Sequence, residues 1–168
     1  MATAYTLISS ITVGSSGAAS MEFTSIPSTY TDLAILTSQR TVSASPWGDV
    51  SVSFNSTTAN LSSKWINAEG GTSVGWGGSG SAIYYWTAAN SATSNTFGNG
   101  LIYIPNYAGN NVKSVSIDNV GENNAANTIL VFTTGLWSDT SAITSVKLTG
   151  GSNFMQYSTA YLYGISNA

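Results

Sequence analysis

With 168 residues the chain is long enough to bury one hydrophobic core, and we expect a single domain spanning residues 1–168. Only 7% of the residues are charged, and four scattered cations against seven acids form no basic surface, which excludes nucleic acid and anionic membranes as expected partners. Histidine and cysteine are absent, which excludes a serine–histidine–aspartate triad, a disulfide framework and a thiolate metal site.

The first half of the chain predicts short strands separated by turns, because apolar and polar residues alternate with a period of two. Strands are expected at residues 5–12, 20–24, 32–41 and 49–54. A further strand at 64–68 is centred on Trp65. The six glycines of residues 70–81 make that segment too flexible to be a regular element alone. The sheet is expected to resume at 81–86.

Two continuous apolar runs stand out in the second half of the chain, at residues 101–104 and 129–132. Each is the pattern of a strand that is covered on both faces. Pro105 ends the first run because proline cannot donate to a strand ladder. We therefore expect Asn106 and Tyr107 to begin a surface loop.

The remaining strands are expected at residues 113–118, 143–148 and 158–163, with a polar loop at 119–127. About nine or ten short strands with almost no helix predict an all-β protein, built as an antiparallel two-sheet sandwich. A jelly-roll-like fold of two four-stranded sheets fits this strand count best. An immunoglobulin-like topology of seven to nine strands is the alternative.

Aromatic side chains are the strongest candidates for a functional surface. We predict Trp47, Trp65, Trp76 and Tyr107 as interface or glycan-contact residues, with Trp47 and Trp76 the most exposed because they lie in loops. Trp86 ends a predicted strand and is expected in the core or at its rim. Large aromatic side chains are common at subunit interfaces, so contact with another protein is the favoured interpretation. A stacking platform for a host glycan is the alternative.

Carboxylates are the second kind of candidate. A glycoside hydrolase needs two of them about 5.5 Å or about 6.5–9.5 Å apart, and Glu22, Asp118 and Glu122 are the acids to test. None of the seven acids lies in a catalytic motif, so we expect no enzyme and no cofactor. The segment 118–124 offers oxygen ligands for Ca²⁺, but its spacing differs from the EF-hand loop. An Asx-rich turn is the alternative interpretation there, and no metal site is predicted.

Three stretches together carry a resemblance to a known group of proteins. They are residues 5–41 (YTLISSITVGSSGAASMEFTSIPSTYTDLAILTSQRT), 96–126 (TFGNGLIYIPNYAGNNVKSVSIDNVGENNAA) and 154–165 (FMQYSTAYLYGI). Their order and content resemble small β-sandwich virion proteins of tailed bacteriophages, especially phages of cyanobacteria and marine bacteria. The resemblance extends over nearly the whole chain and is more specific than any short motif within it.

The resemblance implies a structural part of the virion, usually a trimer, without catalytic residues. The first predicted strand begins within the first few residues and leaves no room for a fibre shaft, which favours a capsid decoration (cement) protein over a tail or fibre part. Its expected partners are its own copies in a homotrimer and the phage major capsid protein or other virion proteins. A receptor- or carbohydrate-binding tail or fibre module is the alternative. No secretory signal is seen, so we expect synthesis in the host cytoplasm and assembly into the virion.

Overall fold

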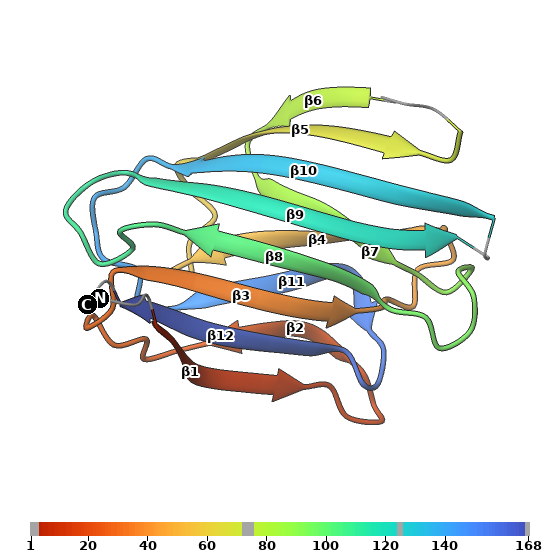
Figure 1. Cartoon of the computed structure of the whole chain (residues 1–168), viewed down its shortest axis with the longest axis horizontal. Coiled ribbons are helices and arrows are strands. Elements are labelled where there is room, and N and C mark those ends of the chain that lie inside the picture. The colour runs from red at the N-terminus through yellow and green to blue at the C-terminus, as the bar shows by residue number, and fades with distance from the viewer. Residues whose placement is uncertain (1–3, 72–75, 124–125, 167–168) are drawn as a thin grey trace.

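The computed structural model describes residues 4–71, 76–123 and 126–166, which form two facing antiparallel sheets (Figure 1). Within these residues, no helix is long and apolar enough to cross a membrane. The strands are β1 (Ala4–Thr12), β2 (Ala18–Phe23), β3 (Asp32–Gln39), β4 (Trp47–Phe54), β5 (Leu61–Glu69), β6 (Trp76–Gly80), β7 (Ile83–Ala88), β8 (Gly98–Ile104), β9 (Lys113–Asn123), β10 (Asn127–Trp137), β11 (Val146–Phe154) and β12 (Thr159–Ser166).

The strand pairing is that of a jelly roll. β1 pairs with β12, β2 with β11, β3 with β8 and β4 with β7. The first four strands thus pair in reverse order with later strands, as in one long antiparallel hairpin that is folded into two sheets. β12 then pairs with β3, and β11 with β4, which joins these pairs into two groups of four strands. The predicted all-β, two-sheet antiparallel sandwich is confirmed.

Two inserted hairpins make one sheet twice as wide as the other. The β5–β6 hairpin lies between β4 and β7 in the chain, and the β9–β10 hairpin lies between β8 and β11. Because β10 pairs with β5 and β9 pairs with β8, both hairpins extend the same sheet. We call β1-β12-β3-β8-β9-β10-β5-β6 the broad sheet and β2-β11-β4-β7 the narrow sheet. The described residues therefore form 12 strands, more than the predicted nine or ten.

The glycine-rich segment contains a strand that the sequence did not predict. β6 pairs with β5, and Gly78 lies directly opposite Trp65. A Cβ atom at Gly78 would lie 2.4 Å from the Trp65 ring, so only glycine leaves room for the indole. Glycine here makes space for a large neighbour in a paired strand, instead of preventing a strand from forming.

The polar loop predicted at 119–127 is also wrong, because β9 continues to Asn123 and pairs with β10, which begins at Asn127. Residues 124 and 125 lie outside the described part of the chain. The period of two persists through this segment, with Asn119 and Gly121 buried and Val120 exposed. The segment is polar in composition, yet its side chains still alternate between the two faces of the sheet. The predicted strand at 143–148 begins later in the structure, because β11 starts at Val146. Ile143 packs into the core from the loop before it.

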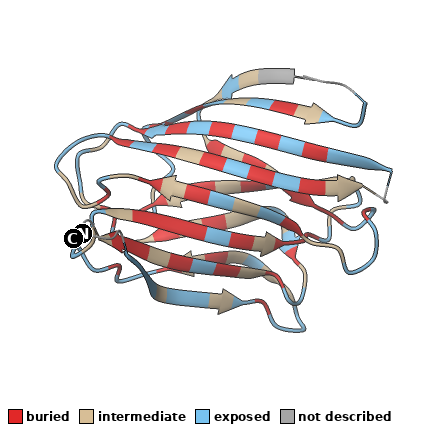
Figure 2. Cartoon of the chain, in the orientation of Figure 1, coloured by how far each residue is buried: buried red, intermediate tan, exposed pale blue. Residues whose placement is uncertain are grey.

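The core fills the space between the two sheets. Figure 2 shows buried and exposed residues alternating along β9 and β10, as expected when one face of a sheet is covered. Trp137 is buried there, and its ring lies 5.5 Å from that of Phe54 on the narrow sheet. Gly135 faces Ile83 of β7 so closely that a Cβ atom would be 2.6 Å from its Cδ1 atom. The inserted hairpins therefore pack tightly over the edge of the narrow sheet.

Two of the four cations are buried structural groups. Nζ of Lys113 donates to the carbonyl oxygens of Gly109 (2.8 Å) and Asn111, and burial lowers the pKa of this ammonium despite the nearby Asp139. The Arg40 guanidinium, only 4% exposed as a residue, donates to four carbonyl oxygens of one loop. They belong to Asn90, Ala92, Thr93 and Thr96. The surface therefore carries even less positive charge than the composition suggests.

Candidate functional site

The four aromatic residues predicted as contacts do not gather at one place. Trp47, at the start of β4, is half-buried, and its Nε1 atom donates to Oε1 of Glu69 (3.2 Å). The Trp65 ring packs on Tyr84, with ring centroids 4.8 Å apart, and is half-buried between β6 and β7. Trp76 begins β6, but its side chain lies outside the part of the chain that the structure describes.

The prediction that Tyr107 begins a surface loop is wrong. After Ile104 ends β8, Asn106 adopts a positive φ of 48° and turns the chain back towards the core. The Tyr107 ring is fully buried, its hydroxyl donates to the Pro27 carbonyl oxygen, and burial raises its pKa. Tyr107 is therefore a core residue and not available for contact with another molecule.

The outer face of the broad sheet is more apolar than an ordinary solvent-exposed face. One row of directly opposed residues crosses five strand pairs, from Tyr161 on β12 through Leu36, Leu101, Asp118 and Phe132 to Ile66 on β5. Five of these six side chains are apolar or aromatic. We use the name apolar face for the exposed large side chains of this surface: Tyr5, Leu7, Leu36, Ile66, Leu101, Val120, Leu130, Phe132, Leu136 and Tyr161.

This face is large enough to be a specific protein interface. Eight strands about 4.8 Å apart and about seven residues long at 3.3 Å per residue give a face of about 800 Å². A standard interface buries roughly 800 Å² on each partner, so the whole outer face of the broad sheet, including the polar residues among its apolar ones, reaches that size. Phe132 is 42% exposed and Leu130 is 48% exposed. The two apolar runs predicted to be covered on both faces are thus covered by this chain on one face only.

The three acids considered for hydrolysis do not converge. Asp118 and Glu122 point outward from the same strand four residues apart, about 13 Å along it, which exceeds the separation that a hydrolase uses. Glu22 lies on β2 of the narrow sheet, 3.5 Å from Nζ of Lys147. Across the described ranges, no three acidic side chains gather as metal ligands.

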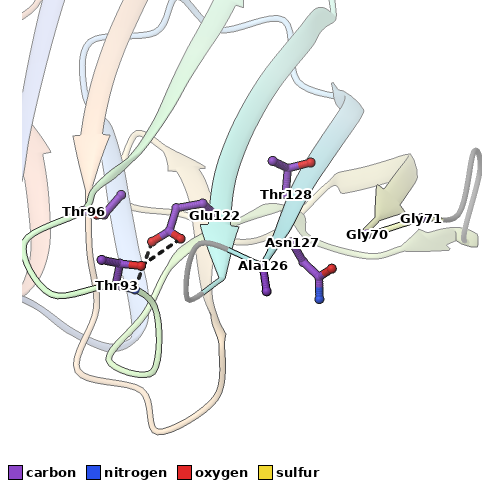
Figure 3. A pocket seen from close by; sticks show the side chains of 8 residues that line it. All are labelled: Gly70, Gly71, Thr93, Thr96, Glu122, Ala126, Asn127 and Thr128. Atoms are coloured by element: carbon purple, nitrogen blue, oxygen red, sulfur yellow. Dashed lines mark hydrogen bonds between the residues drawn. The ribbon is translucent and has the colours of Figure 1, made fainter.

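Glu122 instead ties the β9–β10 hairpin to the loop before β8. Its Oε1 atom accepts a hydrogen bond from the Thr93 backbone N–H (3.0 Å), and its Oε2 atom accepts one from the Thr93 hydroxyl (3.1 Å), as Figure 3 shows. A hollow of about 500 Å³ opens beside this contact, with Gly70 and Asn127 on its other side. Because Arg40 holds the same loop from within, this end of the sandwich is fixed by two charged side chains.

A tyrosine cluster lies at one end of the broad sheet. The Tyr103 hydroxyl donates to Oδ2 of Asp32 (2.7 Å), and this hydrogen bond, with burial and the Asp32 charge, raises the pKa of Tyr103 to about 12. The rings of Tyr5 and Tyr163 meet edge to face, with centroids 6.3 Å apart. Because the bond to Asp32 requires the protonated phenol, this end of the sheet is sensitive to alkali.

We expect the stability contributed by Tyr103 to be fully present below pH 10, its ordinary pKa, and lost between pH 10 and about pH 12. In that range the unfolded chain releases the phenol proton while the folded chain keeps it, so rising pH favours unfolding. Tyr103→Phe should lower the free energy of unfolding by about 1 kcal/mol near neutral pH and have little effect near pH 12. Urea titrations of both proteins across this range measure the difference; a difference independent of pH would contradict the assignment.

A groove crosses the outer face of the narrow sheet, on the opposite side of the molecule. Tyr84 and Trp86 project from β7 next to Asp49 and Ser51 of β4, around a hollow of about 520 Å³. A second hollow of about 380 Å³ shares Asp49 and Trp86 with the first. We call the two together the aromatic groove. It is lined by Ser43, Ser45, Trp47, Asp49, Ser51, Asn67, Glu69, Tyr84, Trp86, Ile129, Thr149, Gly150 and Gly151.

Of the groove residues, the sequence singled out Trp47 as a contact candidate. It placed Trp86 in the core or at its rim and did not select Tyr84 or Asp49. Tyr84 and Trp86 alternate with the buried residues Ile83 and Tyr85, a period-two signal that places both outward aromatics on one face. The described surface thus offers an apolar face on the broad sheet and a separate aromatic groove centred on the narrow sheet, both suited to binding. Searches against protein-family models, curated proteins and solved structures found no match for this chain.

Proposed function

We propose that the chain is a non-enzymatic structural protein of a bacteriophage virion, a capsid decoration (cement) protein that forms a homotrimer and stabilises the head shell. The apolar face is the observation that carries this proposal, because about 800 Å² of weakly charged sheet calls for a covering protein surface. The resemblance of residues 5–41, 96–126 and 154–165 to phage virion proteins supports the setting in the particle.

The arrangement of the apolar face suggests how copies meet. Asp118 divides the cross-strand row into one half with Leu36, Leu101 and Tyr161 and another with Phe132 and Ile66. In a cyclic trimer each subunit presents two different surfaces, one to each neighbour. We assign the first half of the apolar face to one neighbour and the second half to the other. In this arrangement Asp118 stays near the line between the two contacts.

Stabilisation of a shell then follows from mass action. A protein that binds the assembled lattice and not its free subunits lowers the free energy of the assembled state by an amount that grows with its concentration. A surface of hydroxyls and amides suits this role, because its burial avoids the desolvation penalty of charged groups. With Arg40 and Lys113 already buried inside the fold, Lys64 and Lys147 are the cations that remain to be desolvated on assembly.

The test compares phage particles with and without the protein. We expect particles that lack it to assemble and adsorb normally, but to release DNA at a lower temperature or in a milder osmotic shock. Adding the purified protein back should restore resistance. Particles with full heat and osmotic resistance but lost adsorption would overturn the proposal and favour the receptor-binding alternative. Cryo-electron microscopy of the intact particle would locate the subunit on the head or the tail.

A further inference from the structure

We propose that the aromatic groove of the narrow sheet is a binding site for a neutral carbohydrate chain. This inference does not rest on the role in the capsid, because the groove residues from the broad sheet, Asn67, Glu69 and Ile129, are not part of the apolar face. A subunit that buries its apolar face against other copies still presents the groove to solvent.

The stacking surface is formed by Tyr84 and Trp86, both half-buried, which project from β7 two residues apart. This spacing separates the two side chains by about 6.6 Å along the groove. Tyr84 is held from behind by the Trp65 ring at 4.8 Å, so its position is set before any ligand arrives. Flat aromatic faces of this kind pack against the apolar C–H face of a sugar ring, and preorganisation lowers the entropic cost of binding.

Polar groups for sugar hydroxyls lie next to these rings. Asp49 is exposed directly opposite Trp86, and Ser51 lies opposite Tyr84 with its hydroxyl 3.4 Å from the Thr149 carbonyl oxygen. Burial and the Asp49 charge raise the pKa of the Tyr84 phenol, which keeps it a donor. Gly150 and Gly151 complete the lining without a side chain that would fill the hollow.

The second hollow adds an amide whose oxygen lacks a partner. Asn67 is only 6% exposed, and its Oδ1 atom accepts no hydrogen bond from the described residues. It lines the hollow together with Trp47 and Trp86. A buried amide oxygen without a partner is unfavourable. This oxygen is closed to solvent, so Asn67 marks the hollow as polar, and a hydroxyl group would reach it only if the neighbouring side chains shift.

The charge of the lining selects the ligand class. Neither hollow is lined by a lysine or an arginine, while Asp49 and Glu69 are both present. Phosphate groups and sulfated or uronic-acid sugars would meet two carboxylates without a compensating cation. A neutral chain with both C–H faces and hydroxyl groups matches the combination of aromatic rings and carboxylates.

The test measures retardation of the full chain in native gels containing dextran, starch, laminarin, galactomannan or xylan, with polygalacturonate as the anionic comparison. We expect at least one neutral polysaccharide to retard the protein and polygalacturonate to leave its mobility unchanged. Trp86→Ala should weaken this binding at least tenfold, and Asp49→Ala at least threefold. Tyr157→Ala is the matched control, because it removes an exposed aromatic that belongs neither to the groove nor to the apolar face and should leave retardation unchanged.

Melting temperatures of all variants verify that each is folded, and the exposed position of Asp49 keeps the test valid if Trp86→Ala unfolds. Retardation by none of the five neutral polysaccharides, or by polygalacturonate alone, would overturn the inference. So would retardation that Asp49→Ala and a folded Trp86→Ala leave unchanged. Release of reducing ends from a bound polysaccharide would support the groove but contradict the proposed non-enzymatic function. Failure of the heat-resistance test would contradict the capsid role and leave carbohydrate binding unaffected.

Discussion

Arg40→Ala is expected to lower the free energy of unfolding by at least about 3 kcal/mol. The Arg40 guanidinium is buried, and its two terminal nitrogens donate to four carbonyl oxygens at 2.6–3.3 Å. Alanine would leave these acceptors without their donor in a place that water reaches poorly. Because a domain is typically stable by about 5–15 kcal/mol, this single side chain accounts for a large share.

The measurement is urea unfolding followed by tryptophan fluorescence. Arg40→Lys should fall between the wild type and Arg40→Ala, because a single ammonium group cannot replace the planar fork that reaches four carbonyl oxygens. Lys64→Ala is the matched control: it removes an exposed cation and should change stability by less than about 0.5 kcal/mol. A loss below about 1 kcal/mol for Arg40→Ala would show that the loop finds its hydrogen bonds elsewhere.

Leu36→Glu and Phe132→Glu are each expected to dissociate the proposed trimer. Leu36 is 44% exposed and Phe132 is 42% exposed, and they lie in the two different halves of the apolar face. A carboxylate buried at an apolar contact loses its hydration without gaining a partner, at a cost of several kcal/mol. Light scattering coupled to gel filtration should give three times the chain mass of 17.4 kDa for the wild type and the monomer mass for each variant.

Mixing the two variants tests the assignment of the halves. In a cyclic assembly an equimolar mixture retains one unaltered contact, between the intact half of each variant, so it should form a heterodimer that cannot close into a trimer. Thr58→Glu, which adds the same charge to an exposed loop, should remain trimeric. A wild-type chain that is monomeric at high concentration would contradict the proposed homotrimer. Trimers that persist in both variants would contradict the use of this face.

The alternation of apolar and polar residues predicted the fold class but not the width of the broad sheet. Ile83 with Tyr85, or Val50 with Val52, shows locally which residues face inward. The pairing of β10 with β5 joins two segments that are far apart in the chain, and no local pattern reports it. β6 was missed for the same reason: the glycine at 78 is explained only by Trp65 across the strand pair.

The exposure of the candidate aromatic residues was likewise predicted only in part. Trp47 was expected to be exposed in a loop after Pro46, but it is half-buried at the start of β4. Tyr107 was misplaced because a chain that leaves a sheet can return to the core when a residue such as Asn106 adopts a positive φ. Trp86 was expected in the core or at its rim. It lines the groove because β7 is the edge strand of the narrow sheet and exposes one face to solvent. Exposure of an aromatic residue depends on the strand's place in the sheet, which is a tertiary property.

The sequence by itself determined that residues 101–104 and 129–132 are apolar on both faces of their strands, because a period of two assigns neighbouring side chains to opposite faces. Only the tertiary structure decided what covers each face. Ile102 and Ile129 pack into the core, while Leu101 and Leu130 point outward from the broad sheet. The physical reason is that burial of an apolar side chain is favourable whichever surface excludes water from it. That surface is supplied by distant strands or by another subunit, which the local sequence does not report.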